Sequence, residues 1–110
     1  MRDSREYLRD MLDAISKIER HRGKGYEAFK ENELIQVWML YHLQIIGEAA
    51  ARVDKDLRAR TPFIPWEKIV GMRNLLVHEY FGIDLDEVWY TVEHDIPSLK
   101  ASLERLLDER

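Results

Sequence analysis

The sequence predicts an all-α fold: an antiparallel up-and-down bundle of four to five helices that pairs with a second copy of itself. Apolar residues recur at three- and four-residue steps along most of the 110 residues, which is the spacing of one helix face. Glycine and proline separate these stretches, and no stretch alternates every second residue as a strand does. We expect one domain, residues 1–110, because this length closes one hydrophobic core with little surplus.

The first helix is predicted over residues 4–22, with Asp3 or Ser4 as its N-terminal cap. Gly23 and Gly25 end it, and residues 26–31 are predicted to form a short turn. The apolar face of this helix is made of Tyr7, Leu8, Met11, Leu12, Ile15 and Ile18.

A second, longer helix is predicted from a cap at Asn32 to about Arg52. It is apolar on more than one face, so we expect it to be central in the bundle or covered by a second subunit, which favours a homodimer. Gly47 lies inside this helix at a cost of roughly 1 kcal/mol relative to alanine. That cost is explained if another backbone approaches closely at Gly47.

Residues 54–61 are charged and are predicted to form a loop or a short turn of helix. Pro65 suits the first turn of a third helix, which is expected to run to about Glu79. Gly82 then stops it, and Asp84 caps a fourth helix. Pro97 either kinks this fourth helix or begins a fifth one through residues 99–107.

The composition and the charge of the chain exclude several kinds of site and several classes of protein. The chain has no cysteine, which excludes disulfides, thiolate metal sites and cysteine nucleophiles. The charged N-terminus predicts no secretory signal, and the longest apolar run, residues 37–41, is too short to span a bilayer, so a cytoplasmic protein is expected. A net charge of −4 repels nucleic acid overall. Residues 52–73, however, hold six basic residues against three acidic ones, which predicts a local basic rim.

The strongest chemical signal is the segment that contains Arg73, His78 and Tyr80. Arginine binds phosphate, histidine carries protons near neutral pH, and RNA transesterification needs both functions. Five residues place Arg73 and His78 about 140° apart on an ideal helix, so they do not stack on one face. One histidine also does not serve both proton transfers. A dimer that brings two copies of the segment together would supply two histidines and two arginines.

Other residues have plainer interpretations. His21, His42 and His94 lack zinc-ligand spacing, and His94 with Asp95 is expected to be a solvated or capping pair. Glu48 is expected to form an ion pair, with Arg73 as its natural partner if their helices pack together. Tyr80, taken alone, is typical of a buried aromatic residue. Trp38, Trp66 and Trp89 are predicted to be core or interface anchors.

The combination of motifs carries a family resemblance. Arg73, His78 and Tyr80 have the form R-x4-H-x-Y, with Ile45-Ile-Gly-Glu-Ala-Ala50 upstream and Asp95-Ile-Pro-Ser-Leu-Lys100 downstream. Over nearly its whole length the chain resembles the HepT-like branch of the HEPN superfamily.

This resemblance implies a homodimer, or a higher oligomer, with the motif at the dimer cleft. It implies a metal-independent endoribonuclease toxin that acts on cellular RNA without a cofactor. Arg73 and His78 would be catalytic, with Asn74 as the supporting polar residue. The partner would be a minimal nucleotidyltransferase antitoxin of the MntA type, which transfers AMP onto the tyrosine of the motif, here Tyr80.

Two alternatives stay open from the sequence. The chain is a non-catalytic helical binding subunit that assists a minimal nucleotidyltransferase, or it is a purely structural helical dimer. Expression without the partner would harm the cell only if the chain is an active toxin.

Overall fold

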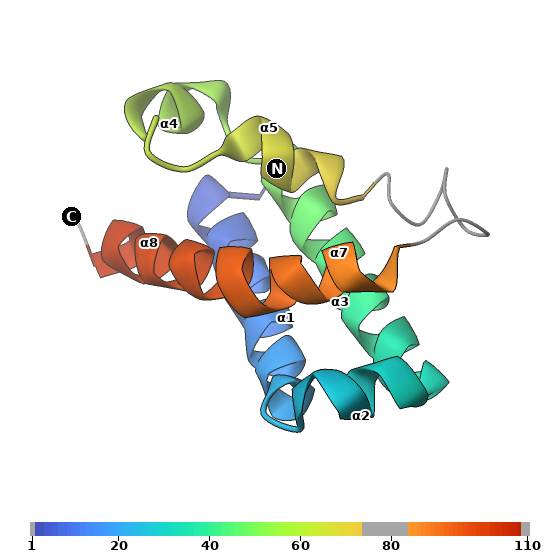
Figure 1. The fold of residues 1–110 in the computed structure, drawn as a ribbon. Helices are drawn as coiled ribbons and strands as arrows, with labels where there is room; N and C mark the ends of the chain where they lie inside the picture. The colour runs from blue at the N-terminus through green and yellow to red at the C-terminus, as the bar shows by residue number, and fades with distance from the viewer. Residues whose placement is uncertain (1, 74–83, 109–110) are drawn as a thin grey trace.

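The computed structural model describes residues 2–73 and 84–108, and every regular element in these two ranges is a helix (Figure 1). None of the described helices is long and apolar enough to cross a membrane. The all-α prediction is confirmed for this part of the chain. The elements are α1 (Ser4–Arg22), α2 (Gly25–Glu31), α3 (Glu33–Ala51), α4 (Lys55–Arg60), α5 (Trp66–Gly71), α7 (Leu85–Tyr90), the π-helix η1 (Thr91–Asp95) and α8 (Ile96–Asp108).

The helices α1 and α3 are the two longest and lie side by side in opposite directions (Figure 1). Asp3 caps α1 by accepting a hydrogen bond from the Arg5 amide at 2.9 Å, and Glu6 completes a capping box. Asn32 caps α3 by accepting from the Leu34 amide at 2.9 Å. The caps and the extents predicted for these two helices are confirmed.

Two short segments are helical. Residues 26–31, expected as a turn, belong to the helix α2, whereas residues 55–60 form α4, capped by Asp54, in agreement with the predicted alternative of a short turn of helix. Helices of six or seven residues are marginal in isolation, so packing stabilises them. Phe29 buries α2 against the ring of Trp89, with ring centroids 5.3 Å apart. Pro65 lies at the N-cap of α5, one residue before the predicted first turn.

The region around Pro97 is continuous helix of changing pitch. Asp84 caps α7 as predicted, accepting from the Asp86 amide at 3.0 Å. The π-helix η1 follows, and its end is marked by the Ile96 amide donating to the Thr91 carbonyl. Pro97 is the second residue of α8. A fifth helix therefore begins next to the proline, as one of the two predicted outcomes had it, but it continues from η1 without a break in the helical backbone.

The core forms where α1, α3 and α8 meet. α8 runs across the α1–α3 pair (Figure 1), and the Lys100 ammonium of α8 binds the Glu19 carboxylate of α1 at 3.0 Å. The apolar core continues to α5, which packs on the C-terminal half of α3. The side chains with almost no exposed surface are Leu8, Met11, Ile15, Ile18, Phe29, Met39, Leu43, Ile46, Val53, Val92, Ile96 and Leu103.

Candidate functional site

One of the predicted site residues lies within the described residues, and the other three lie outside them. Arg73 follows α5 and is described, whereas Asn74, His78 and Tyr80 lie outside the described residues. The roles of those three residues stay predictions. The candidate site is therefore built from what surrounds Arg73.

The backbone of Arg73 lies directly against α3 at Gly47. A Cβ atom added to Gly47 would lie 2.7 Å from the Arg73 backbone nitrogen and 3.1 Å from both the Arg73 Cβ and the Ile69 carbonyl oxygen. No real Cβ tolerates the first distance, so only glycine permits this approach. Ile69 and Met72, both buried, hold α5 in place beside it. The prediction that Gly47 serves a close backbone approach is confirmed.

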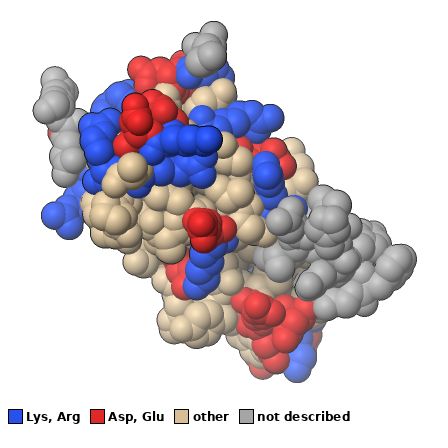
Figure 2. Space-filling view, turned by 90° about the horizontal axis from the view of Figure 1, so that it is seen from above, with Lys and Arg blue, Asp and Glu red and all other residues tan. Residues whose placement is uncertain are grey.

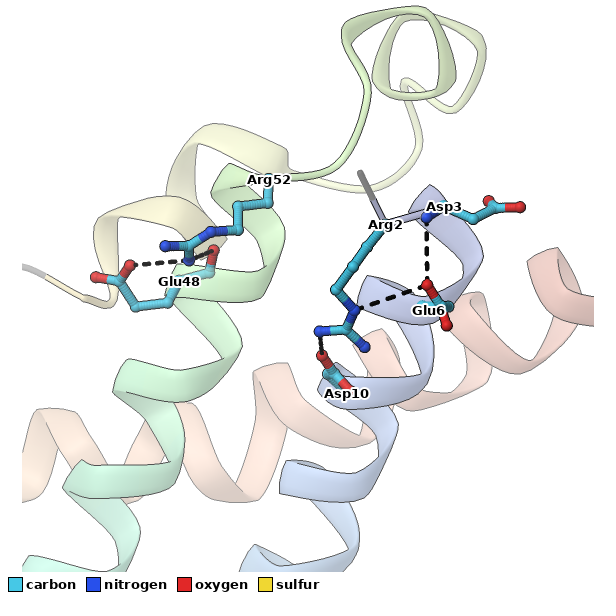
Figure 3. A network of polar contacts seen from close by, with 6 residues as sticks. All are labelled: Arg2, Asp3, Glu6, Asp10, Glu48 and Arg52. Atoms are coloured by element: carbon cyan, nitrogen blue, oxygen red, sulfur yellow. Dashed lines mark hydrogen bonds and ion pairs between the residues drawn. The ribbon is translucent and has the colours of Figure 1, made fainter.

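The guanidinium of Arg73 shares the carboxylate of Glu48 with a second arginine. Glu48 Oε2 lies 4.0 Å from Arg73 Nη1 and 3.3 Å from Arg52 Nη1 (Figure 3 shows the Arg52 contact). This confirms the predicted pairing of Glu48 with Arg73. The side chains of Arg73 and Glu48 are 40% and 42% exposed, and ion pairs this open contribute about 0–1 kcal/mol. Arg73 is thus positioned by a weak contact that a phosphate group can replace.

The outward face of α3 is apolar and uncovered near its N-terminus. Leu34, Val37 and Tyr41 are 82%, 56% and 57% exposed, and their spacing places them on one side of the helix. The same spacing continues through Ile45 and Glu48 toward the C-terminus of α3. An apolar strip on one face of the monomer therefore leads to the ion pair that holds Arg73. We call residues 34, 37, 41 and 45 the α3 strip.

Basic side chains gather at the end of the molecule where α4 and α5 lie. Figure 2 looks onto this end and shows Lys and Arg side chains on one side of the face, with acidic side chains among them. Arg60 is exposed, and its Nε donates to the Asp56 carbonyl at 3.4 Å. Lys68, in contrast, binds the Asp95 carboxylate at 3.0 Å. A local basic rim is present, as the charge count predicts.

Two arginines at this end are not among the site residues predicted from the sequence. Arg52 pairs with Glu48, and their four-residue spacing is a sequence signal for that pair. Arg2 binds Asp10 at 2.7 Å and lies at this end because α1 packs against α3. No local pattern in the sequence indicates where Arg2 lies.

The tryptophans are anchors of the core or of helix contacts, as predicted. Trp66 and Trp89 are buried, and the Trp66 indole donates to the Thr61 hydroxyl at 2.9 Å. Trp38 is half-buried and donates to the Lys17 carbonyl of α1 at 2.7 Å.

Two of the remaining histidines differ sharply in their surroundings. His94 is exposed and stacks on Tyr90 at 4.4 Å, so it is solvated as predicted, while Asp95 pairs with Lys68 instead of capping. His42 is 4% exposed, and its Nδ1 has no hydrogen-bond partner among the described residues. Burial lowers the pKa of His42, and the nearby Lys17 and Arg20 cations lower it further against the opposing effect of Asp13.

Known proteins resemble this chain along almost its entire length. The family described as "Ribonuclease HepT-like" matches residues 11–106, which include Arg73, His78 and Tyr80. A protein of Thermococcus cleftensis named "Probable ribonuclease HepT" is 40% identical over 106 residues, 96% of each chain. "Putative RNase MJ1380" of Methanocaldococcus jannaschii is 38% identical over 104 residues, 94% of this chain and 95% of the relative. No solved structure matches the chain significantly. The chain belongs to the HepT-like ribonuclease family.

Proposed function

We propose that this chain is a metal-independent endoribonuclease toxin that cleaves RNA at a site shared by two copies. The observation that carries the proposal is the intact motif Arg73-x4-His78-x-Tyr80 inside the range that matches the family. The ribonuclease names of relatives that cover nearly the whole chain support RNA as the substrate. The position of Arg73, half-exposed beside a carboxylate that it binds weakly, suits a residue that exchanges that partner for phosphate.

The chemistry is an attack of the RNA on itself. The ribose 2′-oxygen bonds to the adjacent phosphorus while the bond from phosphorus to the 5′-oxygen breaks. One His78 accepts the proton of the 2′-hydroxyl, and the partner subunit's His78 donates a proton to the leaving 5′-oxygen. Arg73 neutralises the charge that grows on the phosphorane. The products are a 2′,3′-cyclic phosphate and a 5′-hydroxyl.

The shared site requires a dimer, and the α3 strip is the surface that we assign to it. Three of its side chains are more than half exposed in the monomer, and apolar surface of this kind is typical of an interface. A twofold axis across α3 would bring both copies of Glu48 and Arg73 toward one cleft. In this arrangement each copy supplies one up-and-down helical bundle to a homodimer, and pairs of dimers would form any higher oligomer.

Control by a partner follows from the tyrosine of the motif. A minimal nucleotidyltransferase antitoxin of the MntA type would transfer AMP from ATP onto the Tyr80 hydroxyl, releasing pyrophosphate and the hydroxyl proton. The added phosphate would carry negative charge beside Arg73 and His78 and compete with RNA for the arginine. Tyr80→Phe would then stay toxic while escaping neutralisation by the partner.

The test is cleavage of RNA by the purified protein in the presence of EDTA. We expect the wild type to produce 2′,3′-cyclic phosphate ends, and both Arg73→Ala and His78→Ala to lose at least about a hundredfold in rate. Lys24→Ala, an exposed residue at the α2 end, is the control for loss of charge. Activity that survives in both site variants would refute the assignment. A wild type that neither cleaves RNA nor slows growth on induction would favour the non-catalytic subunit.

A further inference from the structure

A large hollow opens where the N-terminus of α1, the C-terminus of α3 and α4 meet. Its volume is about 960 Å³, and the side chains that line it include Arg2, Arg5, Arg52 and Arg60. A smaller hollow of about 400 Å³ continues from it between α1 and α3 and reaches Glu48, the partner of Arg73. Arg2, Tyr7 and Arg52 line both hollows, so the two adjoin, and the smaller one lies beside the candidate site.

The larger hollow is basic although the protein is acidic overall. Four arginines and two aspartates line it. Both aspartates cap helices: Asp3 accepts a hydrogen bond from the Arg5 amide at 2.9 Å, and Asp54 accepts one from the Asp56 amide at 3.3 Å. Arg60 has no carboxylate partner among the residues that the structure describes. The smaller hollow, in contrast, contains Asp10, Asp13 and Glu48. Phosphate is therefore favoured in the larger hollow.

The arginines are held in place by contacts that a phosphate can join or replace. Figure 3 shows Arg2, just before α1, bound to Asp10 and to Glu6. The two distances are 2.7 and 3.7 Å, and the Arg2 guanidinium also lies 4.8 Å from the centre of the Tyr7 ring. Arg52, 57% exposed, is bound to Glu48 and to no other carboxylate in residues 2–73 and 84–108. Open pairs of this kind contribute about 0–1 kcal/mol, whereas arginine binds phosphate through two parallel hydrogen bonds. Arg52 also lies one turn of α3, about 6 Å, beyond Glu48, on the way from Arg73 into the hollow.

We propose that the larger hollow binds the RNA backbone next to the phosphate that is cleaved. In this arrangement Arg52 and Arg60 contact flanking phosphates, and Arg2 lines the hollow between these two arginines. This rests on the proposed function, in which RNA is the substrate. A site of this kind reads charge and backbone shape instead of base sequence. It also explains how an acidic protein holds an RNA strand, because four arginines and two aspartates line the larger hollow.

The experiment measures binding without cleavage. A fluorescent single-stranded RNA of twelve nucleotides is titrated with the His78→Ala protein, and its anisotropy is followed between 50 and 200 mM salt. Arg52→Gln with Arg60→Gln is compared with Lys24→Gln and Lys30→Gln, which remove the same charge from exposed residues at the α2 end. All four side chains are exposed, so we expect these variants to fold, and circular dichroism verifies this.

We expect the arginine pair to weaken binding about tenfold at 50 mM salt and to reduce the slope of log affinity against log salt by about 1.4, two contacts at about 0.7 each. The lysine pair is expected to keep the slope of its parent. Equal slopes in the two double variants would overturn the proposal. So would an arginine pair that binds RNA normally but no longer binds the nucleotidyltransferase partner, since the hollow would then be a protein-docking surface.

The same measurements distinguish a failure of the proposed RNA site from a failure of the proposed nuclease function. If His78→Ala binds RNA through the arginines but the wild type does not cleave the same strand, the hollow is an RNA site and the chain is not the nuclease. If the wild type cleaves the strand and the arginine pair binds it as the lysine pair does, the nuclease stands and the hollow is not its RNA site.

Discussion

At the scale of single residues, His42 is buried and lies next to Tyr41 of the α3 strip. Its ring lies 4.6 Å from that of Trp38 and 5.1 Å from that of the exposed Tyr41. Its Nδ1 is buried without a partner among the described residues, so the neutral ring is the form that this environment favours. Burial lowers the pKa of His42 from its ordinary value of about 6.5.

This environment predicts a pH dependence of stability. Below pH 6.5 the unfolded chain takes up a proton at His42 that the folded chain refuses, so this residue lowers stability as the pH falls toward its folded pKa. Between pH 7.5 and 5.5 the loss is at most about 1.4 kcal/mol, because pH 5.5 is one unit below the ordinary pKa. His42→Leu should show a smaller drop in the free energy of unfolding by urea over this range.

His94→Leu is the matched control for the His42 prediction, because His94 is exposed. Its drop in stability between the two pH values should equal that of the wild type. If His42→Leu loses as much stability on acidification as the wild type does, the buried imidazole is not the source of the pH dependence.

At the scale of elements, the contact between α3 and α5 determines where the motif begins. Gly47→Ala would place a Cβ 2.7 Å from the Arg73 backbone nitrogen. Overpacking of this kind lowers the free energy of unfolding by about 1–3 kcal/mol, whereas the better helix propensity of alanine raises it by about 1 kcal/mol. We expect a net loss of about 1 kcal/mol in the free energy of unfolding and a fall in cleavage of at least about tenfold, because Arg73 is displaced.

Gly71→Ala is the control at the other side of this contact. A Cβ at Gly71 would meet nothing within 4 Å, and its φ is not positive, so the variant should keep its activity and be as stable as the wild type or up to about 1 kcal/mol more stable. Equal stability and activity for Gly47→Ala and Gly71→Ala would show that the close approach has no role in placing the motif.

The sequence predicts the long elements well and the short ones poorly, for a physical reason. The helices α1 and α3 carry periodic apolar faces and side-chain caps at Asp3 and Asn32, which are local signals. The helix α2 is stabilised by the burial of Phe29 against distant residues, whereas α4 has no buried residue and packs on the core through the partly buried Leu57. Before Pro97 the chain forms the π-helix η1 and remains helical, and no residue pattern in the sequence predicts this change of pitch.

The candidate site divides in the same way. The Glu48–Arg73 pair and the need for glycine at position 47 follow from residue types and helix positions, and both are confirmed. Arg2 and Arg60 line the same hollow only because α1, α3 and α4 converge. That convergence is a property of the tertiary structure, so the hollow could not be predicted from spacing along the chain.

At the scale of the whole molecule, the α3 strip is the surface on which the proposed dimer depends. Val37→Glu with Tyr41→Glu places two charges where the partner would pack, and both residues are already exposed, so the monomer should still fold. We expect the variant to sediment as a monomer and to lose at least about a hundredfold in RNA cleavage, because half of the site is removed.

Exposed aromatic residues elsewhere provide the control for this variant. Phe63→Glu with Tyr90→Glu changes side chains that are 60% and 57% exposed but lie outside α3. This variant should remain dimeric and active. A Val37→Glu, Tyr41→Glu protein that remains a dimer would place the interface elsewhere, and an active monomer would exclude a shared site.

The most direct test of the shared site is a heterodimer of two inactive copies. Arg73→Ala and His78→Ala chains with different tags are co-expressed, and the mixed species is isolated by two affinity steps. Its RNA cleavage in EDTA is compared with that of each mutant homodimer. We predict partial activity, above both homodimers but well below wild type, because one Arg73 and one His78 from different chains then share the cleft, while water has to take over the proton transfer of the missing second histidine. A heterodimer as inactive as its two parents would contradict a site composed of residues from both chains.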